Sequence, residues 1–294
     1  MTFTATLDGR FSEATEPADW TVIHEVLTTA ELYWRTTGTG IDLRGKRVLL
    51  TGASSGIGAA GARQFAQAGA TVIAVARRKD LLDALVDDIT AAGGDARAVA
   101  CDLSDLTAID ELVETVGPVD ILVNNAGRSI RRPLAESLDR WHDVERTMTL
   151  NYYSPLRLIR GFAPAMIERG DGHIINVATW GVMNEGAPLF AVYNASKAAL
   201  TAVSRIIETE WGSDGVHSTT LFYPLVLTPM IAPTKAYEGL PALTAEEAGE
   251  WMVRAARTRP PRIAPRIAIT SRVIDIVAPG WLNSLMRQQR LQPG

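Results

Sequence analysis

Short apolar runs alternate with longer helical stretches through most of this 294-residue chain, and this alternation limits the fold more than any other feature. The candidate strands are 48–50, 71–76, 96–101, 119–123, 174–177 and 216–222. Strands separated by helices of this length pair in parallel through right-handed crossovers. Because the runs are continuously apolar, both faces of the sheet must be covered. The pattern predicts a doubly wound parallel α/β sheet whose ligands lie beyond the carboxyl ends of its strands.

The chain is expected to have three parts. Residues 1–44 form an N-terminal extension, in which 18–35 carry apolar residues at helical spacing and predict an amphipathic helix. Residues 45–258 form the sheet domain, and 259–294 form a basic amphipathic tail. We therefore expect a single α/β domain with an N-terminal helical extension and a C-terminal helical tail.

Composition excludes several classes of protein. The chain is 47% hydrophobic and 21% charged, which is ordinary for a globular protein. Its net charge of -4 gives no bias toward nucleic acid, and it lacks the run of about twenty uncharged apolar residues that a membrane span needs. The first residues lack the pattern of a secretory signal. The one cysteine, Cys101, fits a reducing compartment, so we expect a cytoplasmic protein.

A glycine-rich turn follows the first candidate strand. Gly52, Gly56 and Gly58 have the spacing Gly-x-x-x-Gly-x-Gly where the strand gives way to a helix. Glycines allow the sharp turn and let the backbone approach a pyrophosphate, which the amides of the helix N-terminus bind. The segment predicts a dinucleotide site, and the alternative is a tight turn without a ligand.

The second strand ends at Ala76, where an acidic residue usually accepts hydrogen bonds from the hydroxyls of an unphosphorylated ribose. Arg77 and Arg78 follow instead, and a guanidinium matches a phosphate in charge and geometry. This predicts NADP(H), although the two arginines could be a solvated start of a helix. Asp102, after the third strand, is placed to bind the adenine amino group or only to begin a turn.

Two further motifs complete the pattern. The Asn-Asn-Ala-Gly turn at 124–127 closes the fourth strand, and its asparagines can tie neighbouring loops together beside a cofactor. Tyr193 stands four residues before Lys197, so a phenol and an ammonium share one helix face. Together with the glycine turn, this pair predicts nicotinamide-dependent hydride transfer assisted by a tyrosine acid.

In this order, the two turns, Asp102, Asn151 and the pair Tyr193 and Lys197 resemble the short-chain dehydrogenase/reductase family over about residues 45–232. The resemblance implies a Rossmann fold, NAD(P)-dependent carbonyl–alcohol chemistry, and a homodimer or homotetramer. It implies that Tyr193 is the catalytic acid or base and that Asn151 holds a water of the proton relay. Lys197 would hold the nicotinamide ribose, and its charge would favour the phenolate of a tyrosine whose ordinary pKa is about 10.

The same resemblance assigns the cofactor contacts to the turns after the strands and to the catalytic helix. They are Gly52, Ser54, Ser55, Gly56, Ile57, Gly58, Arg77, Arg78, Asp102, Leu103, Asn125, Ala126, Gly127, Tyr193, Lys197, Pro224, Val226 and Thr228.

The chain departs from the family after the fifth strand. The family normally has a serine there that holds the substrate oxygen, whereas residues 175–181 contain none. Strand alignment puts Thr179 in that place, and its hydroxyl can donate and accept. If Ala178 is the true equivalent, the clamp on the oxygen is missing. Leu225 also stands where the family commonly has glycine.

Apolar side chains are expected around the substrate, with Trp180, Met183, Phe190 and Met230 in the pocket. Such a lining suits an apolar substrate, although some of these residues could belong to the core or to a subunit interface. From residue 251 onward there are eight arginines and one acid, among apolar residues. This predicts packing on a partner subunit, or else contact with an anionic membrane surface or with acyl-phosphate ligands.

The function predicted from the sequence is an NADP(H)-dependent oxidoreductase that interconverts an apolar ketone or aldehyde and its alcohol. Thr179 orients the oxygen, and Tyr193, Lys197 and Asn151 move the proton. The tail and the loop at 228–235 resemble an actinobacterial branch that acts on fatty acyl or other lipid carbonyls, so a fatty acyl-CoA or lipid carbonyl reductase is one alternative. A non-catalytic NADP-binding scaffold or sensor is another.

Overall fold

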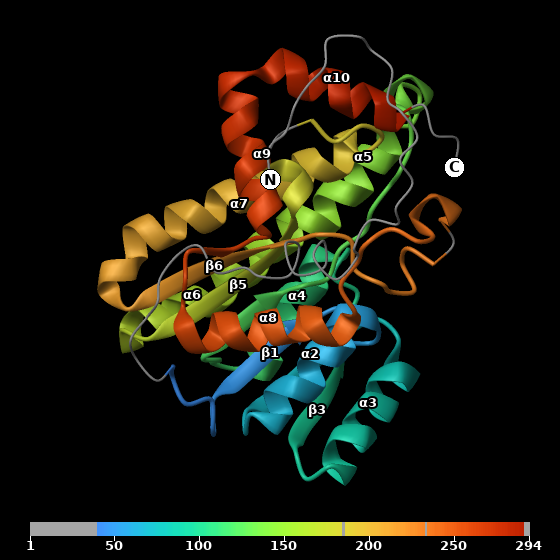
Figure 1. Ribbon diagram of the computed structural model, residues 1–294. Helices are drawn as coiled ribbons and strands as arrows, with labels where there is room; N and C mark the ends of the chain where they lie inside the picture. Colours follow the sequence, from blue (N-terminus) through green and yellow to red (C-terminus); the bar gives the residue numbers. More distant parts are fainter. Residues whose placement is uncertain (1–39, 184–185, 233, 291–294) are drawn as a thin grey trace.

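The computed structural model describes residues 40–183, 186–232 and 234–290, and its strands form one parallel sheet in the order β3-β2-β1-β4-β5-β6-β7 (Figure 1). The strands are β1 (Arg47–Thr51), β2 (Thr71–Ala76), β3 (Asp95–Ala100), β4 (Ile121–Asn124), β5 (Gly172–Thr179), β6 (Val216–Tyr223) and β7 (Arg262–Ile263). The strand order reverses between β1 and β4, which is where ligands bind in open sheets of this kind. The predicted helix at 18–35 lies outside the described residues.

The predicted sheet is confirmed, with small shifts at the strand ends. The run at 71–76 coincides with β2, whereas β5 and β6 extend beyond the runs that predicted them. Strand β7 was not predicted; it has only two residues and pairs with β6.

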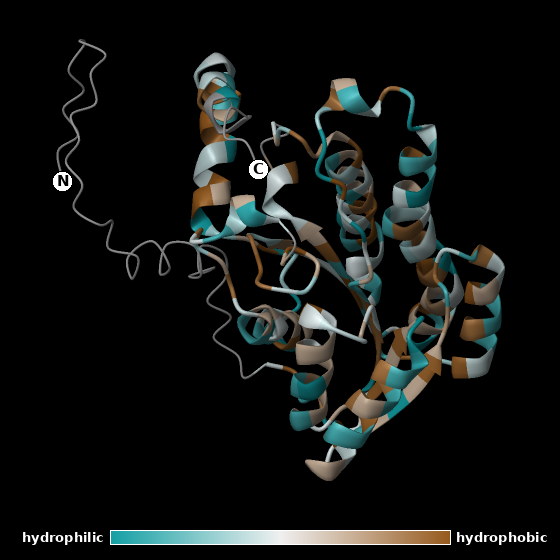
Figure 2. Cartoon of the chain, turned by 90° about the vertical axis from the view of Figure 1, so that its right-hand side faces the viewer, coloured by the Kyte–Doolittle hydropathy of each residue, from teal (hydrophilic) through white to brown (hydrophobic). Residues whose placement is uncertain are grey.

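Helices cover both faces of the sheet, because successive strand residues point to opposite sides. The α-helices of the described residues are α2 (Gly56–Gln67), α3 (Lys79–Ala91), α4 (Leu106–Val116), α5 (Trp141–Met148), α6 (Ser154–Arg169), α7 (Ala191–Trp211), α8 (Ala245–Thr258), α9 (Arg266–Val277) and α10 (Pro279–Arg290). Val48 and Leu50 pack in one core with residues of α2, α3 and α8. Leu49 packs in the other core with residues of α4, α6 and α7. In Figure 2 the strands carry long brown stretches between helices that mix brown with teal.

The C-terminal helices leave this layered body. After β7, α9 rises away from the sheet, and α10 turns back across the top of the view in Figure 1. No helix in the described segments is long and apolar enough to cross a membrane.

Candidate active site

A cavity of about 1130 Å³ lies at the carboxyl ends of the strands. Ligand pockets commonly measure about 300–1,000 Å³, so this one has room for a dinucleotide and a second molecule. Every residue predicted to contact the cofactor lines it. The turns after β1, β2, β3, β4 and β6, which are far apart in sequence, therefore meet in one place.

The glycine turn after β1 needs its glycines for steric reasons. Gly52 and Gly56 have φ angles of +69° and +55°, a region that residues with a side chain rarely adopt. A Cβ on Gly58 would lie 2.2 Å from the carbonyl oxygen of Gly52, which is too close for any other residue. The backbone is thereby folded into a cradle at the start of α2, where the amides of a helix N-terminus attract phosphate.

The turn after β4 is tied to the turn after β1. The hydroxyl of Thr51 accepts hydrogen bonds from the backbone amides of Asn125 and Ala126 at 2.9 and 3.0 Å. The side-chain amide of Asn125 donates to the carbonyl oxygen of Thr51 at 2.9 Å. The predicted tie between neighbouring loops is confirmed, and it holds both turns in a fixed relation at the point where the strand order reverses.

The end of β2 presents a cation to the glycine turn. Arg78 donates from Nη2 to the hydroxyl oxygens of Ser54 and Ser55, each at 2.9 Å, while Arg77 is exposed on the same side of the cavity. A guanidinium held beside two hydroxyls and a helix N-terminus is a suitable donor set for a phosphate. These contacts fit the 2′-phosphate of NADP(H). Asp102 also lines the cavity, and its carboxylate accepts from the amide of Ser104 at 3.0 Å.

Two of the residues predicted to transfer the proton, Tyr193 and Lys197, come from α7. Burial lowers the pKa of Lys197 to about 8, and the Lys197 ammonium donates to the carbonyl oxygen of Val177 at 2.8 Å. Burial, with a smaller contribution from the phenol of Tyr237, raises the pKa of Tyr193 to about 12. The predicted lowering of the Tyr193 pKa is therefore wrong for this structure, because desolvation outweighs any effect of the nearby ammonium. A neutral phenol at physiological pH is suited to donate a proton.

The residues at the end of β5 differ in exposure. Ala178 is 3% exposed and packs in a small apolar cluster with Met183 and Phe222. Thr179 is less buried, and its hydroxyl oxygen accepts a long hydrogen bond of 3.4 Å from the amide of Gly181. Both residues line the cavity, and the assignment of Thr179 to the substrate oxygen stays a prediction.

Three of the four predicted pocket residues line the cavity, namely Trp180, Phe190 and Met230. Met183 does not, and its assignment to the pocket is corrected. Its side chain is buried in the apolar cluster beneath the end of β5 because the short helix η3 (Trp180–Val182) turns it inward.

Asn151 lies behind the cavity wall rather than in it. It sits in the π-helix η2 (Thr149–Tyr153), is fully buried, and accepts from the backbone amide of Arg128 at 2.9 Å. Its own amide donates to the carbonyl oxygen of Arg128 at 2.9 Å and to the hydroxyl of Ser196 at 3.0 Å. These contacts hold the loop that follows β4, and the relay water remains a prediction.

Two groups of lining residues were missed by the sequence analysis. The first is Arg128 and Arg131, which directly follow the Asn-Asn-Ala-Gly turn and so could have been noticed. The second is the inner side of α9 and α10, which comprises Ile267, Thr270, Ser271, Ile274, Trp281, Leu282, Leu285 and Met286. The tail was expected to meet a partner subunit, a membrane or acyl-phosphate ligands, and in the structure its inner side forms a largely apolar wall of the cavity.

Comparison with known proteins gives consistent matches. A family model described as short chain dehydrogenase matches residues 46–239. A fatty acyl-CoA reductase of Mycobacterium tuberculosis is 72% identical over 86% of this chain and 88% of the relative. A fatty acyl-CoA reductase of Acinetobacter baylyi is 46% identical over 83% of this chain and 84% of the relative. A solved 3-oxoacyl (acyl-carrier-protein) reductase from Agrobacterium tumefaciens, with NADP bound, has a TM-score of 0.68 at 28% identity, covering 78% of this chain and 94% of that chain.

Proposed function

We propose, from the premise that this chain belongs to the short-chain dehydrogenase/reductase family and is an oxidoreductase, that it reduces fatty acyl-CoA to the aldehyde with NADPH. One observation carries the proposal. A single cavity joins the glycine cradle, the side chains of Thr179, Tyr193 and Lys197, and the apolar wall from α9 and α10. The names of the two relatives from Mycobacterium tuberculosis and Acinetobacter baylyi support the same substrate class.

The proposed cofactor is NADP(H), which supplies the hydride that is transferred to the carbonyl carbon. The glycine turn binds its pyrophosphate, and Arg78 with Ser54 and Ser55 binds its 2′-phosphate. Lys197 lies at the far end of the cavity from these residues in the proposed arrangement and holds the nicotinamide ribose. Leu225 adds apolar surface to the same cavity.

In the proposed mechanism, side chains of this protein stabilise and then protonate the substrate oxygen as negative charge develops on it. Thr179 donates to the thioester oxygen and orients it, and Tyr193 gives that oxygen a proton as the carbon gains the hydride. The resulting hemithioacetal then breaks its carbon–sulfur bond: its hydroxyl loses a proton, the thiol gains one, and aldehyde and coenzyme A leave. Each turnover thus consumes one hydride and one proton for one thioester.

A covalent acyl-cysteine route does not fit this chain. Cys101 is its one cysteine and lies after β3, beside Asp102 at the proposed adenine end of the cavity. Burial and the nearby carboxylates raise the pKa of the Cys101 thiol, which disfavours the nucleophilic thiolate. Direct hydride transfer to the thioester is therefore the route that these residues support.

Reduction of a simple apolar aldehyde or ketone is the second candidate, because it needs the same oxygen clamp and proton donor without the loss of a thiol. The test is NADPH consumption with palmitoyl-CoA, with hexadecanal and with a long-chain ketone, and identification of the products by mass spectrometry. Formation of hexadecanal and free coenzyme A supports the proposal. Turnover of the aldehyde or ketone but never of the thioester would establish the second candidate instead.

The proposed assembly is a homodimer or homotetramer with an additional peripheral contact to membranes. The outer side of α9 exposes Val273, Ile276 and Val277, beside the exposed Arg272, and is suited to an anionic lipid surface. Light scattering measures the assembly, and co-sedimentation with phosphatidylglycerol vesicles against phosphatidylcholine vesicles measures the lipid contact. A monomer that stays in the supernatant with both lipids would contradict these two proposals.

A further inference from the structure

The loop after β4 carries two arginines that line the cavity, Arg128 and Arg131. Within the described ranges, the side chains of Arg128 and Arg131 make no hydrogen bond or ion pair with the protein. The Nε atom of Arg128 is buried and unsatisfied. A guanidinium that is partly removed from water without an acceptor is costly, so such groups are usually matched by a ligand when they line a binding site.

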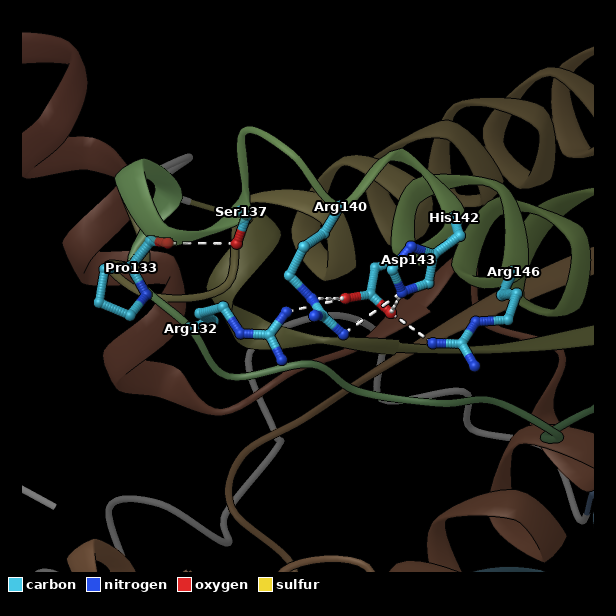
Figure 3. A network of polar contacts seen from close by, with 7 residues as sticks. All are labelled: Arg132, Pro133, Ser137, Arg140, His142, Asp143 and Arg146. Carbon is cyan, nitrogen blue, oxygen red and sulfur yellow. Dashed lines mark hydrogen bonds and ion pairs between the residues drawn. The ribbon is translucent and has the colours of Figure 1, made fainter.

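The neighbouring arginines are paired with a carboxylate. The side chains of Arg128 and Arg131, unpaired among the described residues, are therefore not part of a generally solvated, positively charged surface. Arg132 and Arg140 donate to the carboxylate of Asp143 at 2.8 and 2.9 Å, and Arg146 donates to its other oxygen (Figure 3). These contacts hold the pKa of the Asp143 carboxyl well below its usual range. Asp143 is already bound by three arginines and is not available to Arg128 or Arg131.

The loop that carries the two free arginines is held at both ends. Both backbone polar groups of Arg128 bond to the side chain of Asn151, each at 2.9 Å. Four residues later, the amide of Arg132 donates to the carbonyl oxygen of Leu189 at 2.8 Å. Leu189 itself has a φ of +72°, a strained conformation for a residue with a side chain. Because the loop is already held at both ends, binding an anion here costs little further conformational entropy.

The position of the loop indicates that the cofactor is not the missing anion. In the sheet, β2 and β4 flank β1 on opposite sides, so Arg77 and Arg78 lie on one side of the glycine turn and Arg128 lies on the other. The 2′-phosphate and the pyrophosphate are assigned to the first side and to the turn itself. The cations beyond β4 remain available for a second molecule.

Arg128 and Arg131 lie near two other parts of the cavity lining, Lys197 and Tyr237. Gly127, which precedes Arg128, is close enough to Lys197 that a Cβ there would lie 3.3 Å from its Nζ. Burial raises the pKa of Tyr237 and the charge of Arg131 acts in the opposite direction, which places Arg131 near η5 (Lys235–Tyr237). The apolar wall of α9 and α10 forms another part of the same cavity.

We infer that Arg128 and Arg131 form a binding site for the phosphates of the phosphopantetheine arm that carries the acyl chain. The inference rests on the proposed function and divides the substrate between two surfaces. The acyl chain lies on the apolar wall of α9 and α10, the thioester lies at Tyr193, and the phosphate end lies on the loop after β4. Coenzyme A and a carrier protein share this phosphate, and the experiment separates them.

Binding is measured without turnover, by titration calorimetry of the NADP⁺-loaded enzyme with free coenzyme A, 4′-phosphopantetheine and pantetheine. Removing one charged hydrogen bond to phosphate lowers affinity about 10- to 100-fold. We expect this loss for coenzyme A and phosphopantetheine in Arg131→Gln and in Arg128→Gln, with partial recovery in Arg131→Lys. Pantetheine, which has no phosphate, should bind the parent and Arg131→Gln equally. Arg146→Gln, a nearby arginine outside the cavity lining, is the charge-matched control and should bind as the parent does.

Several outcomes would overturn the inference: no binding of coenzyme A to the parent, equal affinity in the parent and both glutamine variants, or an equal loss with pantetheine. A loss confined to coenzyme A would also overturn it, because it would place the arginines at the nucleotide phosphates instead of the phosphopantetheine arm; a loss shared with phosphopantetheine supports the inference and extends it to carrier-bound substrates. Palmitoyl-CoA reduction is measured in parallel. If the parent reduces palmitoyl-CoA but the variants bind normally, only the phosphate site fails. If the variants lose binding but no thioester is reduced, only the proposed function fails.

Discussion

Lys197 donates a hydrogen bond of 2.8 Å from its ammonium to the backbone carbonyl oxygen of Val177. This contact joins α7, the helix of the proposed proton donor Tyr193, to β5, two residues before Thr179. The partner is a neutral carbonyl rather than a carboxylate, so no opposite charge offsets the desolvation of the ammonium. For this reason the pKa of Lys197 falls to about 8.

The first prediction is a loss of reductase activity at alkaline pH. Below pH 8 Lys197 is protonated and can pass a proton toward Tyr193, and above it the charge is lost. The value of kcat/KM for reduction should be constant below about pH 8 and then fall about tenfold per pH unit. A profile that stays flat to pH 10 under conditions where NADPH binding is unchanged would show that the proton of Lys197 is not needed.

The second prediction concerns stability. The folded pKa of Lys197 lies below its ordinary 10.5, so the folded state disfavours the charge. Lys197→Met should remove a penalty of about 3 kcal/mol and lose one hydrogen bond of about 1 kcal/mol, for a net gain of about 2 kcal/mol at pH 7. Between pH 8 and 10.5 the unfolded state binds more protons, so the parent gains stability and the difference should shrink.

Urea unfolding of both proteins across this pH range measures the effect on the free energy of unfolding. A variant that is less stable than the parent at every pH would mean that the contact with Val177 outweighs the desolvation of the ammonium.

The third prediction separates proton donation from cofactor binding. Tyr193→Phe keeps the ring and removes the hydroxyl, so the affinity for NADPH should stay within about twofold while kcat falls by about 10³-fold or more. Fluorescence titration with NADPH and single-turnover kinetics measure the two quantities. If the phenylalanine variant retains most of its rate, the proton comes from another group.

The sheet and the cofactor end of the site were predictable because they depend on local patterns. In the turn with Gly52, Gly56 and Gly58, few other residues are possible, because neighbouring atoms leave too little room for a side chain. The apolar wall was not predictable, since the apolar residues of a tail do not reveal which surface they face. Met183 was misplaced for a related reason: one residue of helical rotation decides whether a side chain points to the cavity or to the core.

The pKa of Tyr193 was predicted in the wrong direction because the sequence shows the neighbouring charge but not the depth of burial. The same limit applies to Asn151, whose side chain is occupied by Arg128 and Ser196. Sequence motifs thus located the groups, whereas solvation and competing hydrogen bonds needed the structure.

The fourth prediction is cofactor preference. Arg78 bridges Ser54 and Ser55 where the 2′-phosphate is proposed to bind, so Arg78→Gln should weaken NADPH binding at least tenfold, about 1.4 kcal/mol, and leave NADH binding unchanged. Arg63→Gln, an exposed arginine of α2 paired with Asp88, is the control and should change neither affinity. An equal loss for both cofactors would mean that Arg78 only supports the turn, and equal affinity of the parent for NADPH and NADH would contradict the preference itself.

The last prediction tests whether Thr179 takes the place of the family serine. If Thr179 holds the substrate oxygen, its hydroxyl matters and its methyl group does not. Thr179→Ser should keep or raise the rate, whereas Thr179→Val, which has a similar shape without the hydroxyl, should lose about 10²-fold in kcat. Ala178→Ser is the matched control: it adds a hydroxyl one residue earlier, at a position 3% exposed beside Met183 and Phe222. A valine variant as active as the parent, or a large gain from Ala178→Ser, would place the oxygen clamp at residue 178 or remove it from the mechanism.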